Sequence, residues 1–125
     1  MPSILYIDNP TFEGRSELAE AMKARLGAEV VLAESIEEFA QKILQKKFDL
    51  YVCGDSMLFQ GKIVQGWEAL RKFLRQKEDL MKLAVLSNRT SVVEDAQLSQ
   101  VTAFNKKTGF EDFLQYAKTF LDTAV

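Results

Sequence analysis

Short polar clusters with reactive side-chain types follow four of the apolar segments in this sequence. They are Asp8 and Asn9 after the first segment, Gly54, Asp55 and Ser56 after the third, Ser87 and Asn88 after the fourth, and Lys106, Lys107 and Thr108 after the fifth. Carboxylate oxygens are ligands that Mg²⁺ prefers. A lysine and a hydroxyl beside such an ion can hold the oxygens of a phosphoryl group. These residue types therefore fit metal-assisted phosphoryl chemistry.

The segments that would position these residues alternate between strand-like and helix-like patterns. Apolar runs at residues 4–7, 29–33, 50–53, 83–86 and 101–105 predict five short strands. The stretches between them carry apolar residues at helical spacing, as in Leu18, Met22 and Leu26. Alternation of this kind predicts an α/β fold of five βα units, a doubly wound three-layer sandwich around a five-stranded parallel sheet.

In an open parallel sheet, ligands bind outside the carboxyl ends of the strands. The polar clusters all follow strand ends, so the predicted topology brings two carboxylates, an amide, a hydroxyl and a lysine to one edge. Any single one of these residues is explained by loops that meet water at strand ends. The set as a whole favours a site or the remnant of one.

Composition limits the classes of function. The chain has 125 residues and a net charge of −2, so we expect one domain over residues 1–125 and no nucleic-acid partner. Residues 4–7 are too short an apolar run for a signal peptide, and we expect no membrane span and a cytoplasmic location. The sequence has no histidine and a single cysteine, Cys53. This excludes histidine-dependent catalysis and thiolate metal clusters on this chain.

Several of these segments resemble the receiver domain of two-component response regulators, along the whole chain. ILYIDN is similar to the first strand of that family with its acidic pair, FDLYVCGD to the phosphoacceptor strand and QGWEALRKFL to the opening of the third helix. LAVLSN and AFNKKTGFEDFLQYAKTFL are similar to the fourth strand and to the fifth strand with the last helix. The resemblance implies the CheY-like, flavodoxin-like fold with strand order 2-1-3-4-5. It also implies roles for Asp8 as a metal ligand, Ser87 as the signalling hydroxyl, Phe104 as the switch aromatic and Lys107 as the phosphate-contacting lysine.

The sequence departs from the family pattern at the positions that carry the chemistry. Asn9 stands where a second metal-binding acid is usual, and counting from Asp49 puts Gly54 at the phosphoacceptor position. Asp55 comes one residue late, which in a straight strand turns its side chain to the opposite face. A bulge at Gly54 would bring Asp55 back. The loop from residue 55 to residue 66 is also longer than usual.

We therefore predict a receiver-like signal-transduction domain that is not an enzyme and binds a protein partner without phosphorylation. It would need no cofactor, and Asp8, Asn9 and Asp55 would form at most a vestigial Mg²⁺ site. The resemblance implies a partner surface made by the fourth helix, the fifth strand and the last helix. Four residues mark this expected surface: Phe104, Lys106, Glu111 and Gln115.

Two other functions remain open. In the first, the chain is a true receiver in a two-component phosphorelay, with Asp55 as phosphoacceptor, Ser87 and Lys107 in supporting roles, Mg²⁺ as cofactor and a histidine kinase or phosphotransfer protein as partner. In the second, it is a flavodoxin-like FMN carrier. The second is disfavoured because the loop over residues 9–14 lacks the hydroxyls and glycine that cradle a flavin phosphate, and because Asp8 and Glu13 would repel an anion.

Overall fold

A computed structural model describes residues 1–65, 67–70, 74 and 82–123 of the chain. The elements follow in the order β1 (Ser3–Ile7), α1 (Arg15–Leu26), β2 (Glu29–Ala33), α2 (Ile36–Gln45), β3 (Leu50–Cys53), β4 (Ser56–Phe59), β5 (Lys62–Gln65), β6 (Leu83–Ser87), α4 (Thr90–Leu98), β7 (Thr102–Asn105) and α5 (Phe110–Thr123). Residues 68–70 and 74 are helical, and residues 66 and 71–73 of the predicted helix QGWEALRKFL lie outside the described residues.

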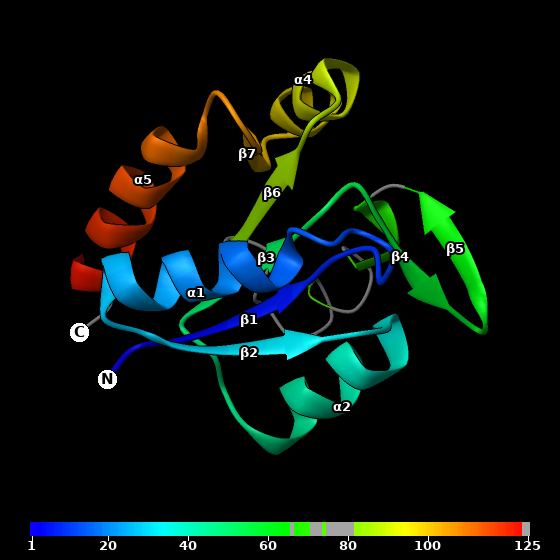
Figure 1. Cartoon of the computed structure of the whole chain (residues 1–125), viewed down its shortest axis with the longest axis horizontal. Helices are drawn as coiled ribbons and strands as arrows, with labels where there is room; N and C mark the ends of the chain where they lie inside the picture. The colour runs from blue at the N-terminus through cyan, green and yellow to red at the C-terminus, as the bar shows by residue number, and fades with distance from the viewer. Residues whose placement is uncertain (66, 71–73, 75–81, 124–125) are drawn as a thin grey trace.

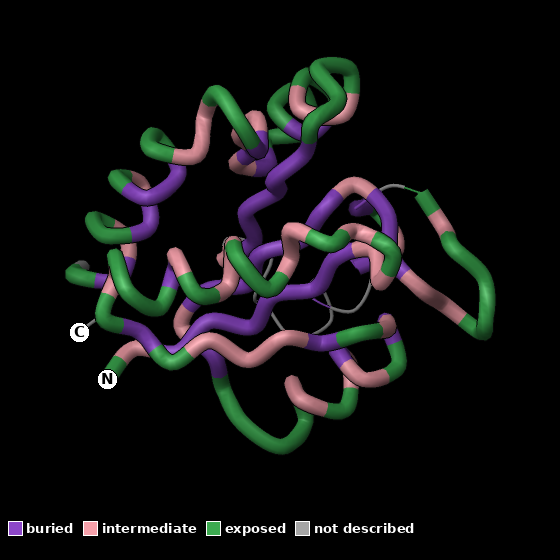
Figure 2. Tube along the Cα trace, viewed as in Figure 1, coloured by how far each residue is buried: buried purple, intermediate pink, exposed green. Residues whose placement is uncertain are grey.

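The main sheet is parallel, with strand order β2-β1-β3-β6-β7 (Figure 1). Its strands are the five that the sequence predicts, so the predicted order 2-1-3-4-5 and the α/β three-layer fold are confirmed. The predicted fifth strand, β7, lies at an edge of the sheet, while β1, β3 and β6 lie inside it and are buried along their whole length (Figure 2).

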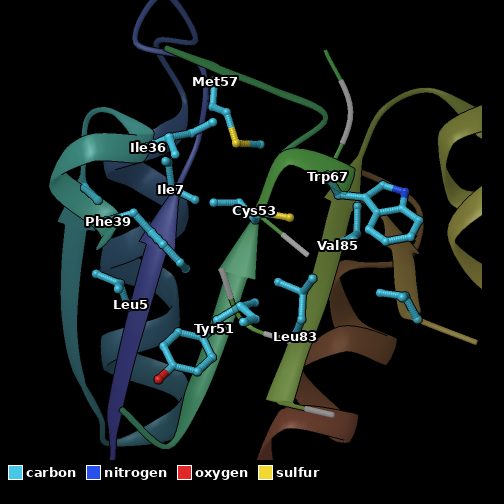
Figure 3. Close-up of a cluster of buried hydrophobic side chains, with 14 of the residues drawn as sticks. Leu5, Ile7, Ile36, Phe39, Tyr51, Cys53, Met57, Trp67, Leu83 and Val85 are labelled. Carbon is cyan, nitrogen blue, oxygen red and sulfur yellow. The ribbon is translucent and has the colours of Figure 1, made fainter. Parts of the chain in front are cut away.

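Each face of the sheet packs against its own set of helices. Alternate residues Leu5, Tyr51 and Val85 belong to a cluster with Phe39 of α2 and with Trp67, shown in Figure 3. The intervening strand residues belong to a second cluster with α1 and α5, whose members include Met22 and Phe113. Burial of one large apolar side chain contributes about 1.5–3 kcal/mol, so the two clusters hold both helical layers to the sheet. Within the described part of the chain, no helix has the length and apolar character needed to cross a bilayer.

The long loop predicted after the third strand contains a β-hairpin that the sequence did not indicate. Strands β4 and β5 pair antiparallel as a separate two-stranded sheet. The turn between them is Gln60–Gly61, and both residues have positive φ values of 51° and 76°. Such turns suit the twist of a hairpin, but they are usually marked by Asn-Gly or Asp-Gly. Glutamine at the first turn position hid the signal.

Replacing Gly61 with alanine tests this hairpin turn. A side chain at φ 76° is strained although no atom lies within 4 Å of the added carbon, so Gly61→Ala should lower the free energy of unfolding by about 1 kcal/mol. Gln60→Asn, which suits the same turn better, should not lower it. Urea denaturation measures both variants. Equal stability of Gly61→Ala and the unaltered chain would contradict the turn geometry.

Candidate functional site

Side-chain alternation along the strands brings three of the predicted edge positions together on the face covered by α1 and α5. Asp8, Gly54 and Lys106 each lie two residues beyond a side chain that packs on that face, namely Tyr6, Val52 and Phe104. Because successive residues of a strand point to opposite faces, a spacing of two keeps each pair on the same side. The carboxyl ends of β1, β3 and β7 therefore meet around Asp8.

Asp8 is fully buried, and both of its carboxylate oxygens are occupied. Oδ2 accepts a hydrogen bond from the Tyr6 hydroxyl at 2.5 Å and lies 2.8 Å from Nζ of Lys106. Oδ1 accepts a hydrogen bond from the backbone N–H of Asn9 at 2.8 Å. A buried carboxylate is tolerated when a counter-charge and hydrogen bonds satisfy it, and Asp8 has both.

Lys106, and not Lys107, is the lysine that reaches this carboxylate. The Lys106 side chain is 5% exposed, and its Nζ lies 3.9 Å from the centre of the Phe12 ring, which adds a cation–π contact. Lys107 is exposed, and its backbone N–H donates to the Asn105 side chain. The predicted pocket position of Lys107 is therefore wrong by one residue. The spacing of two from Phe104 was the signal that could have identified Lys106.

Gly54 continues the strand without a bulge. Its backbone N–H donates to the carbonyl of Ile7 at 2.9 Å, which extends the parallel ladder between β1 and β3. A Cβ atom added to Gly54 would lie 2.5 Å from Cγ of Asp8 and 2.9 Å from its Oδ2. The Asp8 carboxylate thus fills the space that a side chain at position 54 would need, and a glycine is required here by close approach.

The Asp55 carboxylate pairs with Arg89 and not with the group around Asp8. Its Oδ2 lies 3.2 Å from Nε of Arg89, the residue that precedes α4. The buried Ser87 hydroxyl accepts a hydrogen bond from the backbone N–H of the same Arg89 at 3.0 Å. The structure therefore groups Asp55 and Ser87 around Arg89, while Asp8 pairs with Lys106. Arg89 carried no signal in the sequence because its role depends on the tertiary position of the loop before α4.

The three residues predicted as metal ligands do not fit a shared Mg²⁺ site in this arrangement. Asp8 is held by Tyr6 and Lys106, and Asp55 by Arg89. The Asn9 amide donates to the Ser56 hydroxyl at 2.9 Å, and its oxygen accepts from the backbone N–H and the hydroxyl of Thr11. Among the described residues, no group of three acidic, histidine or cysteine side chains is placed to hold a metal ion. Mg²⁺ needs near-octahedral oxygen ligands, and both Asp8 oxygens, the Asn9 oxygen and Oδ2 of Asp55 already have other partners.

Burial controls the protonation of two neighbouring groups. The pKa of the Tyr6 hydroxyl is raised far above its usual value, first by burial and then by the negative charge of Asp8. Tyr6 therefore stays neutral and donates a hydrogen bond to the Asp8 carboxylate. Burial likewise raises the pKa of the Cys53 thiol, with a further contribution from Asp8, so this buried cysteine is not a nucleophile.

Of the four residues predicted to mark the partner surface, Lys106 is buried, whereas Glu111 and Gln115 are exposed on α5. Lys106 is buried against Asp8, and the Phe104 ring packs on α5, 6.0 Å from Phe113 and 5.6 Å from Tyr116. Glu111 forms a two-pronged ion pair with Arg25 of α1, and Gln115 lines the same shallow hollow between α1 and α5. Lys106 was therefore wrongly placed on an open face, whereas the exposed Glu111 and Gln115 lie on the side of α5 toward α1, and their part in partner binding stays a prediction.

No protein-family model matches this sequence, and no curated protein is significantly similar to it. Comparison with solved structures is informative. The chain superposes on the receiver domain of the Francisella response regulator 1452 with a TM-score of 0.73 and 17% identity, with 100% of both chains covered. The response regulator TrrA from Thermotoga maritima, in complex with Mg²⁺–BeF, gives a TM-score of 0.72 and 22% identity over 97% of this chain and 100% of that one.

A third structure, the signal receiver domain of an HD domain-containing protein from Pseudomonas fluorescens, gives a TM-score of 0.74 and 16% identity over 98% of this chain and 88% of that one. The likeness spans nearly the whole chain in each case. This protein therefore has the CheY-like fold of response-regulator receiver domains, as the sequence resemblance implied.

A lysine comparison tests the buried ion pair. Lys106→Met leaves the Asp8 carboxylate buried without its counter-charge, which should lower the free energy of unfolding by about 3–5 kcal/mol. Lys107→Met is the matched control, because Lys107 is exposed, and it should change stability by less than about 0.5 kcal/mol. Chemical denaturation of both variants is the measurement. Similar effects of the two substitutions would contradict the pairing.

Removal of the Tyr6 hydroxyl should change both stability and its pH dependence. At neutral pH, Tyr6→Phe loses a charge-assisted hydrogen bond and should cost about 1.5–3 kcal/mol. Tyr6 has a raised pKa when folded, so its stabilising effect is present below the unfolded value of 10.0 and is lost as the pH rises above it. The unfolding free energies of the two proteins should converge above about pH 10, by about 1.4 kcal/mol per pH unit. If the difference in unfolding free energy between the two proteins stayed constant from pH 8 to pH 11, the pKa of Tyr6 would not be raised by folding.

Proposed function

We propose that this chain is a receiver-like signal-transduction domain that binds a protein partner and does not accept a phosphoryl group. It acts as an interaction module, not as an enzyme, and requires no cofactor. A cytoplasmic location and the absence of nucleic-acid and membrane partners belong to the same proposal. The fold supports a role in signal transduction, and the arrangement around Asp8 supports independence from phosphorylation.

The observation that carries the proposal is the contact of Asp8 with both Lys106 and Gly54. The Lys106 ammonium group supplies the positive charge that neutralises Asp8, at 2.8 Å. Gly54 offers no carboxylate, and the space beside it is filled by Asp8 itself. Phosphoryl transfer depends on a nucleophile held in line with the phosphorus and on a cation that stabilises the developing charge. At position 54 both the nucleophile and the space for it are missing.

The alternative is a true receiver that accepts a phosphoryl group on Asp55 from a histidine kinase or phosphotransfer protein. Related folds are compatible with this chemistry, because one neighbour, a Burkholderia pseudomallei response regulator, carries a phosphorylated aspartic acid. Here Asp55 would first have to leave Arg89 and then move toward Lys106. A flavodoxin-like FMN carrier is the third possibility, and a colourless purified protein would dismiss it.

The position of the partner surface around α4, β7 and α5 also belongs to the proposal. Of the four residues first chosen to mark it, Lys106 is buried against Asp8, and Glu111 is already paired with Arg25. At the end of α4, Leu98 is 84% exposed and is a large apolar side chain available for contact. Substitution of Leu98 is therefore a better probe of that surface than substitution of Glu111.

Treatment with acetyl phosphate and Mg²⁺ tests independence from phosphorylation. The intact mass of the folded chain should stay unchanged, because position 54 lacks a nucleophile and Asp55 is paired with Arg89. Gly54→Asp should not gain a phosphoryl group either, since its side chain would collide with Asp8.

Asp55→Asn, Asp49→Asn and Gly54→Asp show which carboxylate carries any phosphoryl group that appears. If a labile adduct of one phosphoryl group appeared and was lost in Asp55→Asn but retained in Asp49→Asn, Asp55 would be a phosphoacceptor and the proposal would be wrong. Asp49 is the matched control because it is a carboxylate before the same strand, where it accepts a hydrogen bond from the backbone N–H of Ser3. An adduct that formed only on Gly54→Asp would show that Asp8 gives way, and would also contradict the account of the site.

A further inference from the structure

The β4–β5 hairpin projects beyond the carboxyl edge of the main sheet and belongs to none of its five strands (Figure 1). The outer edge of β4 pairs with another segment of the chain, whereas that of β5 has no backbone partner among the described residues. Leu58 of β4 forms a parallel bridge with Ser35, at the start of α2, and the backbone N–H of Gln60 donates to the Glu37 carboxylate at 3.1 Å. The outer edge of β4 is therefore covered by the chain around the start of α2.

The register of the hairpin shows which backbone groups of β5 point outward. Residues that flank a two-residue turn form a hydrogen-bonded pair, here Phe59 with Lys62, and such pairs alternate along an antiparallel ladder. Leu58 and Ile63 are then a pair whose N–H and C=O groups point away from each other. The bridge from Leu58 to Ser35 agrees with this assignment. On β5, the outward groups are those of Ile63 and Gln65, and neither has a backbone partner outside the hairpin in the described part of the chain.

The open edge is held in place by packing beneath the hairpin. Met57 is fully buried, and Phe59 and Val64 pack against the core cluster that contains Trp67. Two side-chain hydrogen bonds tie the hairpin to neighbouring loops, from Asn9 to Ser56 at 2.9 Å and from Arg89 to Gln65 at 3.3 Å. A strand anchored in this way pays little conformational entropy when a second strand pairs with it.

The side chains along the edge limit what can pair with it. Ile63 is 45% exposed, and Lys62 is exposed and makes no ion pair with any described residue. Edge strands usually carry charges or proline that block pairing, yet after Lys62 this strand continues with two β-branched residues. A partner could therefore contact two outward pairs of N–H and C=O groups, one aliphatic side chain and one exposed ammonium group.

We propose that β5 is a docking strand for an extended segment of a partner protein, which adds antiparallel to β5 with an aliphatic residue beside Ile63 and a carboxylate near Lys62. This inference rests on the proposed function as an interaction module, and it names the surface and the chemistry of the partner. Strand addition of this kind takes its affinity from main-chain hydrogen bonds and its specificity from alternate side chains.

A second copy of this chain fits the edge less well. Two β5 strands paired antiparallel would bring Lys62 of each copy to the Gln65 end of the other. Arg89 lies there with a half-exposed side chain, and its Asp55 partner is 17% exposed, so the outward charge at that end is positive. Lys62 of each copy would then approach Arg89 of the other, and this repulsion at both ends would oppose a pairing that is only four residues long.

The test uses ¹⁵N-labelled full chain and a blocked peptide of alternating valine and threonine that ends in aspartate, followed by NMR. The amide signals of Ile63 and Gln65 should shift as peptide is added. Ile63→Pro removes one outward donor and should weaken binding about three- to tenfold, whereas Ile63→Val keeps the donor and should bind as the unaltered chain does. Lys62→Glu should weaken binding about twofold or more, and the matched control Lys47→Glu, at another exposed lysine, should not.

Shifts that map to β2 or β7, no shift at millimolar peptide, or equal binding by Ile63→Pro and Ile63→Val would overturn the docking strand. A concentration-dependent dimer in sedimentation that Ile63→Pro abolishes would assign the edge to a second copy and overturn the proposed occupant. The titration is run with and without Mg²⁺ and acetyl phosphate. Binding that required both reagents would retain the docking strand but contradict independence from phosphorylation, and failure in both conditions would contradict the docking strand alone.

Discussion

The buried ion pair between Asp8 and Lys106 is the contact on which the carboxyl edge of this domain depends. The two residues follow β1 and β7, which are separated in the sheet by β3 and β6. At about 4.8 Å per strand, a bridge between them must cross roughly 14 Å of sheet edge, which requires a long side chain and free space above the intervening strand ends. Lysine supplies the length, and Gly54, at the end of β3, leaves room beside Asp8. The buried carboxylate of Asp8 thus needs both the counter-charge of Lys106 and the absence of a side chain at Gly54.

The alternation of side chains along the strands then divides the edge into two separate groups. Asp8, Gly54 and Lys106 lie on the side of α1 and α5, whereas Asp55 and Ser87 meet Arg89 before α4. Arg89 also contacts Gln65 of the hairpin, so the second group connects the loop before α4 with β5. A receiver fold with its acidic pocket closed by a lysine thus retains contacts between loops that a protein partner could exploit. This arrangement is the basis of the proposal that the domain binds its partner without a phosphoryl group.

Much of the fold could be predicted from the sequence because the buried strands are short, apolar and separated by helical patterns. Counting from Asp49 placed Gly54 at the phosphoacceptor position but left a bulge there open, and the hydrogen bond from Gly54 to Ile7 decides for the straight register. The choice of Lys106 over Lys107 was missed because family spacing was preferred to alternation from Phe104. The hairpin was hidden by a Gln-Gly turn, which lacks the usual asparagine. The orientation of Glu111 toward Arg25 depends on how α5 packs against α1, which no local pattern encodes.

The most direct test of the central claim is an NMR titration with Mg²⁺ that follows the Asp8 carboxyl carbon and the Lys106 ammonium nitrogen in the same sample. If Lys106 takes the place of a cation beside Asp8, the ammonium signal should be protected from rapid exchange with water, and neither signal should move at physiological, millimolar Mg²⁺. A saturable shift of the Asp8 carbon at micromolar Mg²⁺, with simultaneous loss of the protected Lys106 signal, would show that the metal displaces the lysine and would contradict the account.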